Sequence, residues 1–132
     1  MMRDLFEDEF DDMLDSSMTF YEYAEQAMNF AVYDGCLIYP SLGLTGEAGE
    51  FSDKVAKLLR DDVLPLDGGD PVIDLDIDDR FALAKELGDV LWMITAAAND
   101  LGFDLDEIAQ INIDKLSSRH RRGSLRGSGD NR

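Results

Sequence analysis

The sequence predicts an all-α protein, a four-helix bundle formed by one domain. Three observations predict this fold: four stretches repeat apolar residues with a helical period, short connections join most of them, and no stretch has a convincing strand pattern. The 132 residues are 45% hydrophobic, which is enough for one modest core. Amphipathic helices joined by short connections bury their apolar faces against one another, so a bundle is the expected architecture.

The first helix is predicted over residues 19–34, in the stretch "TFYEYAEQAMNFAVY". Thr19 and Glu22 have the spacing of a capping box, in which each side chain accepts a hydrogen bond from the backbone amide of the other residue. The second helix is predicted to begin around Pro40 and Ser41 and to end near Arg60.

The third helix is predicted over residues 79–100, where apolar residues recur from Leu83 to Leu101 at 3.6-residue spacing. The connection over residues 61–78 is rich in Pro, Gly and Asp, which predicts irregular structure. Asp104 and Glu107 repeat the cap spacing and predict the start of a fourth helix.

The domain boundaries follow from composition. Residues 1–16 are predicted to form an acidic N-terminal arm, residues 17–122 the folded domain, and residues 123–132 a flexible basic tail rich in Gly, Ser and Arg. No stretch approaches the roughly 20 apolar residues of a membrane span, and the N-terminus is acidic where a signal peptide is basic. Cys36 is the single cysteine and is expected to be buried, which suits a reducing compartment, so we expect a cytoplasmic protein.

The net charge of -17 is unevenly distributed. Residues 1–114 hold 28 acidic and 6 basic residues, whereas residues 115–132 hold 1 acidic and 6 basic residues. An acidic body repels the phosphate backbone of nucleic acids, so direct nucleic-acid binding is not expected. The same charge suits metal cations, or ligands that arrive with cations bound. The alternative is that it only keeps the protein soluble.

Two pairs of acidic residues are the main candidates for chemistry. Glu47 and Glu50 lie three positions apart in the second helix, and Glu86 and Asp89 lie three apart in the third. Each pair therefore shares a helical face, and antiparallel packing of the two helices would bring all four carboxylates together. Such a group repels itself unless cations lie within it, and oxygen ligands of this kind suit Mg²⁺, with Mn²⁺ as a substitute.

Glycines accompany these acids, although each costs about 1 kcal/mol in a helix interior relative to alanine. Gly46, Gly49 and Gly88 would let a ligand or a neighbouring helix approach the backbone. The alternative is a solvated face, on which Glu50 pairs with Lys54 four residues on, and Asp53 pairs with Lys57. A diiron site is excluded because it needs Glu-x-x-His motifs and the one histidine, His120, lies beyond the helix core.

The fourth helix carries Asn112, Lys115 and Arg119 on one stripe. Donors and cations in this arrangement can hold phosphate oxygens. The alternative is a basic helix end that complements the helix dipole.

The stretches "GLTGEAGEFSDKVAK", "KELGDVLWMITAAANDLG" and "INIDKLSSRHRRG" together resemble the MazG-like all-α nucleoside triphosphate pyrophosphohydrolases. The resemblance covers roughly residues 19–132. It implies the all-α NTP pyrophosphatase fold as a homo-oligomer, dimer or tetramer. The apolar faces of Trp92, Met93 and the first helix are the candidates for the subunit interface. It also implies Mg²⁺-dependent hydrolysis of nucleoside or deoxynucleoside triphosphates between the α and β phosphates, giving the monophosphate and pyrophosphate.

The resemblance assigns roles by position. It implies that the four acids are metal ligands. With Mg²⁺ bound there, Glu50 is expected to double as the general base, and Lys115 with neighbouring arginines to stabilise charge in the transition state. The implied substrate contacts are Asn112, Lys115, Arg119, Lys54 and Lys57 for the phosphates, Gln26 and Asn29 for reading the base, and Phe30 or Trp92 for stacking on it. A competing interpretation is a non-catalytic acidic bundle that mimics DNA or senses nucleotides.

Overall fold

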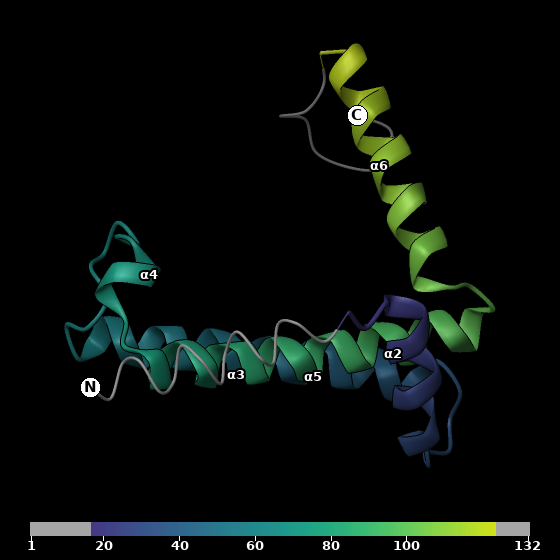
Figure 1. Ribbon diagram of the computed structural model, residues 1–132, viewed down its shortest axis with the longest axis horizontal. Helices are drawn as coiled ribbons and strands as arrows, with labels where there is room; N and C mark the ends of the chain where they lie inside the picture. The colour runs from purple at the N-terminus through teal and green to yellow at the C-terminus, as the bar shows by residue number, and fades with distance from the viewer. Residues whose placement is uncertain (1–16, 124–132) are drawn as a thin grey trace.

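The computed structural model describes residues 17–123, and every regular element in this part of the chain is helical (Figure 1). The all-α prediction is confirmed. The predicted N-terminal arm lies outside the described residues, as does the tail after Gly123. The elements in order are α2 (Phe20–Ala27), the 3-10 turn η1 (Met28–Phe30), α3 (Ile38–Arg60), α4 (Pro71–Asp74), α5 (Ile77–Leu101) and α6 (Leu105–Arg121).

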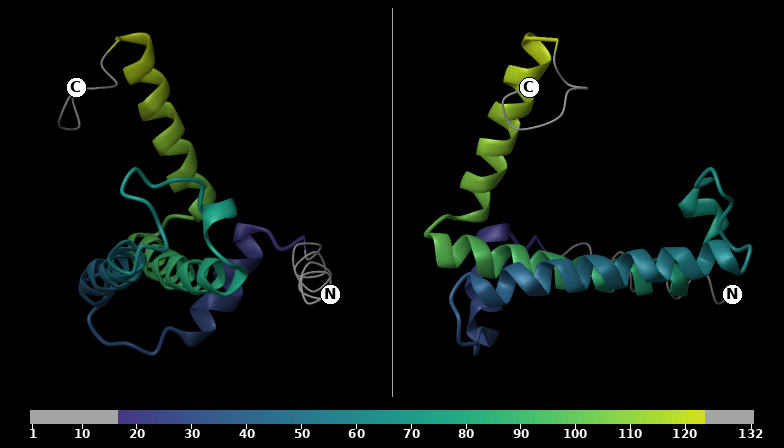
Figure 2. Two further views of the ribbon diagram at one scale, coloured as in Figure 1. Left: turned by 90° about the vertical axis from the view of Figure 1, so that its left-hand side faces the viewer. Right: turned by 180° about the vertical axis from the view of Figure 1, so that it is seen from behind.

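The body of the molecule is an antiparallel pair of long helices, α3 and α5, which lie side by side along their length (Figures 1 and 2). The second and third predicted helices match them to within about two residues at each end. The two helices approach closely where Gly43 of α3 faces Met93 of α5. A Cβ at Gly43 would lie 2.5 Å from Met93 Sδ. Met93 is therefore a core residue, 8% exposed, and leaves little surface for the predicted contact with another subunit.

The segment from α2 to the start of α3 covers one end of the pair. The predicted helix over residues 19–34 is too long, because α2 ends at Ala27 and only one 3-10 turn follows. Tertiary contacts overrule the helical periodicity here: Asp100 Oδ2 accepts hydrogen bonds from the Tyr33 hydroxyl (2.9 Å) and from the Leu37 amide (2.6 Å). These bonds fix the connection in a non-helical path with a turn before α3, in which Cys36 is exposed rather than buried as expected.

The connection over residues 61–76 is mostly irregular, as predicted, and contains one short helix, α4. Asp70 caps α4 by accepting a hydrogen bond from the Val72 amide. Leu64 and Leu75 are buried and attach this connection to the pair, while the segment between them extends away from it (Figure 1).

The last helix, α6, stands away from the long pair (Figures 1 and 2). Gly102 adopts the left-handed conformation (φ 75°) that ends α5, and the Asp104–Glu107 capping box then starts α6 as predicted. Among the elements of residues 17–123, only α2 and α5 make more than isolated contacts with α6. All four predicted helices exist, but one chain does not close them into a bundle, and Ile113 of α6 remains 56% exposed.

None of the helices in the described part of the chain is long and apolar enough to cross a lipid bilayer.

Candidate metal and nucleotide site

Three of the four predicted carboxylates converge between the long helices. Glu47 of α3 and Glu86 and Asp89 of α5 each offer an oxygen, and these oxygens all lie within 4.8 Å of one another. The three-residue spacing on α5 keeps Glu86 and Asp89 on one face, and the antiparallel pairing brings Glu47 to the same level. We call these three residues the acid group.

The acid group has a strong excess of negative charge. Burial, and then repulsion from Glu50, Asp89 and Glu86, raise the pKa of Glu47 above its ordinary value. Within the described residues, Glu86 Oε2 is buried and has no hydrogen-bond partner. A hard divalent cation would satisfy this buried oxygen and neutralise carboxylates that lie within 4.8 Å of one another, so these residues fit Mg²⁺ or Mn²⁺.

Glu50 lies beside the acid group without belonging to it. It follows Glu47 by about one turn of α3, is exposed, and acts on Glu47 through its charge. The expected pairing of Glu50 with Lys54 is replaced by an ion pair across the helices, with Lys54 Nζ 3.3 Å from Glu86 Oε1. Lys57 pairs with Asp53 at 2.6 Å, as the solvated-face alternative expected, and both are exposed.

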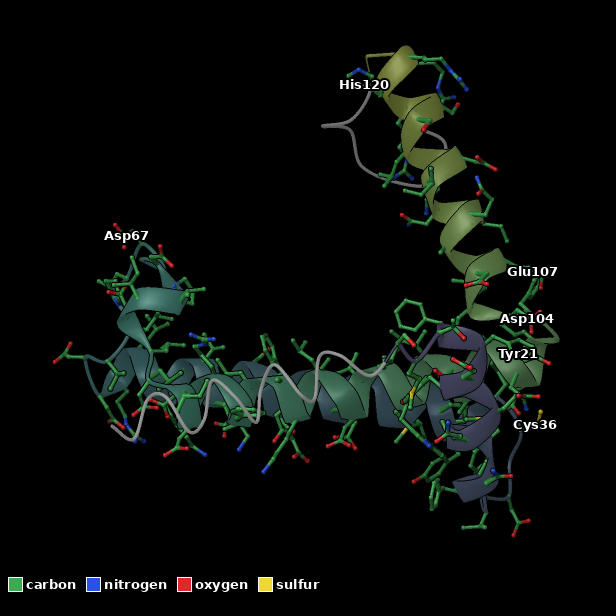
Figure 3. The ribbon with its side chains drawn as sticks, in the orientation of Figure 1. Tyr21, Cys36, Asp67, Asp104, Glu107 and His120 are labelled. Carbon is green, nitrogen blue, oxygen red and sulfur yellow. The ribbon has the colours of Figure 1, made fainter. Side chains whose placement is uncertain are left out.

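The predicted phosphate contacts on α6 are not brought to the acid group within one chain. Asn112 and Lys115 are exposed, and Arg119 is 5% exposed. Figure 3 shows why: α6 leaves the long pair near Glu107 and carries His120 far from it. Sequence spacing placed these residues correctly on one helix and did not reveal the direction of that helix.

An aromatic cavity of about 330 Å³ lies beside η1 and the start of α3. Two of the residues that line it, Phe30 and Trp92, were predicted to stack on a base, whereas Gln26 and Asn29 are exposed on α2 and η1 and do not line it. The sequence interpretation missed the other lining residues, although the closely spaced aromatics of "NFAVYDGCLIYP" were a usable signal. The full lining is Phe30, Val32, Tyr33, Asp34, Tyr39 and Trp92.

Hydrogen bonds and ring contacts hold this cavity in shape. Tyr33 stacks on Tyr39 with ring centroids 4.8 Å apart and meets Trp92 edge-on at 6.2 Å. Trp92 Nε1 donates to the Ala27 carbonyl at 3.1 Å. Burial and the hydrogen bond to Asp100 raise the pKa of Tyr33 to about 12, so its hydroxyl stays protonated and keeps donating. Trp92 follows Asp89 by three residues, which places the cavity about one turn of α5 from the acid group.

The helical glycines around the acids face open space. A Cβ at Gly46, Gly49 or Gly88 would meet no atom within 4 Å, so packing inside this chain does not require any of them. Gly46 shares a face of α3 with Glu50, four residues on, whereas Gly49 shares one with Asp53. Clearance for a ligand is therefore expected at Gly46 rather than at Gly49.

Gly46→Ala and Gly49→Ala are expected to separate these two roles. Each raises the free energy of unfolding by about 1 kcal/mol through helix propensity, visible as a rise in melting temperature of about 4 °C. Only Gly46→Ala should also weaken binding of a ligand at the acid group, because the added methyl group would occupy the open space on the face of Glu50. Equal ligand affinity in the two variants, measured by calorimetry, would show that Gly46 gives no clearance to a ligand.

The comparisons with known proteins indicate a family for the chain. A sequence profile of the MazG nucleotide pyrophosphohydrolase domain matches residues 41–124, a range that includes the acid group and all of α6. The chain is also 42% identical over 118 residues to the Gene 37 protein of Mycobacterium phage L5, covering 83% of this chain and 96% of the phage protein. No solved structure gives a significant match to the chain.

Proposed function

Because the chain belongs to the MazG nucleotide pyrophosphohydrolase family, we propose that it hydrolyses nucleoside or deoxynucleoside triphosphates between the α and β phosphates. The products are the nucleoside monophosphate and pyrophosphate. The observation that carries this proposal is the acid group, whose three carboxylates lie within 4.8 Å of one another and include a buried oxygen of Glu86 without a donor. Carboxylates in this arrangement suit a metal-dependent phosphate chemistry.

Glu47, Glu86 and Asp89 would hold Mg²⁺, with Glu50 as a fourth ligand at the open side. Bound Mg²⁺ supplies charge neutralisation for the triphosphate and makes a coordinated water more acidic. Lys54, 3.3 Å from Glu86, balances part of the remaining negative charge. Lys57, which follows it on α3, extends this basic edge toward the distal phosphates.

Glu50 is the general base in this proposal. Its exposure leaves its carboxylate accessible to a water molecule, and its position about one turn from Glu47 keeps it beside the metal ligands. The water attacks the α phosphorus in line, Glu50 accepts its proton, and pyrophosphate leaves.

The basic stripe of α6 supplies the phosphate contacts. Asn112, Lys115 and Arg119 share one helical face and would stabilise charge on the phosphate oxygens in the transition state. Since α6 stands away from the acid group of its own chain, we propose a homo-oligomer in which α6 serves the site of another copy.

The aromatic cavity is the proposed base pocket. Trp92 and Phe30 offer flat faces for a nucleobase, and its volume of about 330 Å³ lies at the small end of the range for ligand pockets, roughly 300 to 1,000 Å³. Gln26 and Asn29 do not line the cavity, and their amides would read the edge of the base where it extends beyond the cavity toward α2 and η1. The single cysteine suits a reducing compartment, so we place this activity in the cytoplasm.

A product assay tests the proposal. The purified protein is incubated with each of the eight common NTPs and dNTPs in Mg²⁺, and the products are separated by ion-exchange chromatography. The expected products are monophosphate and pyrophosphate, with no turnover when EDTA replaces Mg²⁺. Diphosphate with inorganic phosphate, or no turnover of any of the eight nucleotides, would contradict the proposed function.

A further inference from the structure

Two parts of the chain extend from the same side of the long helix pair, at its opposite ends. One is the acidic loop, residues 61–76, with Asp67 at its tip, and the other is α6, which ends near His120 (Figure 3). The view from behind shows the same arrangement, with open space between the two projections (Figure 2, right).

These two projections carry opposite charge. The acidic loop contains six aspartates and no lysine or arginine, whereas the basic end of α6, residues 119–122, contains three arginines and a histidine. Within residues 17–123, Asp61 is the one loop aspartate in an ion pair, which it forms with the neighbouring Arg60 at 2.7 Å, and all six loop aspartates are exposed. Most of the loop charge thus faces solvent in one copy of the chain.

Both projections also expose large apolar side chains. Leu66 at the tip of the acidic loop is 97% exposed and Ile73 of α4 is 79% exposed. On α6, Ile113 is 56% exposed. Exposed apolar surface beside charge of one sign is typical of a surface that a partner covers.

We infer that two copies of this chain associate about a two-fold axis, with the acidic loop of each against the basic end of α6 of the other. This inference rests on the homo-oligomer proposed above and specifies how it forms. A two-fold axis across the open space would bring the far end of each α6 to the end of the opposite long pair from which the acidic loop projects, because α6 and the loop extend from opposite ends of the pair on the same side.

Charge selects this arrangement over its alternatives. Contacts of loop with loop, or of helix end with helix end, would place like charges together and be repelled, whereas the reciprocal exchange pairs opposite charges. In a two-fold dimer each contact occurs twice, so both loops and both helix ends are matched at once. The exposed apolar residues of the loop and of α6 are covered in the same step.

Charge reversal tests the inference. In the loop-reversed variant, Asp67→Lys and Asp74→Lys are combined; in the helix-reversed variant, Arg121→Glu and Arg122→Glu are combined. The dimer dissociation constant, measured by sedimentation equilibrium, should weaken by at least about tenfold in each variant, because each now opposes like charges. Circular dichroism verifies that each variant keeps its helix content. Asp67→Lys alone removes one exposed hydrogen bond, donated by the Gly69 amide, and should also raise the dimer dissociation constant.

Recombination of the two changes is the matched control. A chain with all four substitutions has the wild-type net charge and opposes unlike charges again, so its dissociation constant should return to within about threefold of wild type. An equimolar mixture of the two reversed variants should form heterodimers for the same reason. Two outcomes would show that the inference is wrong and leave the homo-oligomer standing. In the first, the reversed variants dimerise as tightly as the wild type; in the second, neither the four-substitution chain nor the mixture restores association. A wild type that is monomeric at micromolar concentration would contradict both, whereas the product assay judges the enzymatic activity separately.

Discussion

Glu50→Gln is expected to lower turnover by about 10² to 10⁴-fold, the contribution typical of a positioned general base. Glutamine has nearly the same shape and cannot accept the proton of the attacking water. Glu50 is exposed and lies outside the acid group, so the substitution should leave the fold intact. The measurement is kcat for the best nucleotide of the product assay, with circular dichroism to verify the fold.

A neighbouring acid on the same helix provides the control. Asp53→Asn removes one negative charge three residues further along α3, where Asp53 pairs with Lys57 in an exposed ion pair, and it should retain nearly full turnover. Mn²⁺ binding followed by electron paramagnetic resonance separates the two roles of Glu50. A general base alone leaves Mn²⁺ affinity unchanged, whereas a fourth ligand weakens it. Full turnover by Glu50→Gln would show that the base lies elsewhere.

The two long helices were predictable because the spacing of apolar and acidic residues along the sequence determines their extent and their faces. Apolar periodicity gave α3 and α5 to within about two residues, and the i, i+3 spacing of Glu86 and Asp89 places them on one face of any straight helix. Two long helices with a connection of 16 residues pack most simply as antiparallel neighbours, which brings Glu47 to these acids. This part of the candidate site therefore needed only helical geometry and one packing assumption.

Features decided by distant contacts were not predictable in this way. The helical pattern of residues 28–34 was overruled by Asp100, which lies more than sixty residues away and fixes Tyr33 and Leu37. Lys54 could pair within α3 or across to α5, and only the packed structure shows that Glu86 is its partner. The direction of α6 follows from the turn at Gly102, and no periodicity within α6 encodes that turn.

Glu47→Gln is expected to have opposite effects on stability and on metal binding. Burial and the surrounding carboxylates raise the pKa of Glu47 above its ordinary value of 4.5, so its ionised form is disfavoured in the folded, metal-free protein. The contribution of Glu47 to the free energy of unfolding is fully present below pH 4.5 and is lost as the pH rises through the raised pKa. The variant does not titrate here, so its advantage in melting temperature over wild type should grow across that pH range. Mg²⁺ binding should weaken by at least about 10 to 100-fold, the loss seen even when residues behind the ligands are removed.

Glu22→Gln gives the opposite sign and serves as the control. Hydrogen bonds from the Thr19 amide and hydroxyl lower the pKa of Glu22, so its ionised form stabilises the fold above pH 4.5 and the variant should melt below wild type there. Thermal melts in EDTA from pH 4 to 8, with Mg²⁺ titrations by calorimetry, measure both effects. Saturating Mg²⁺ should abolish the advantage of Glu47→Gln, because the cation removes the repulsion that the substitution relieves. If Glu47→Gln had the melting temperature of wild type in EDTA at every pH, the carboxylates of the acid group would not destabilise the metal-free fold. The strongest physical argument for a metal at this site would then fail.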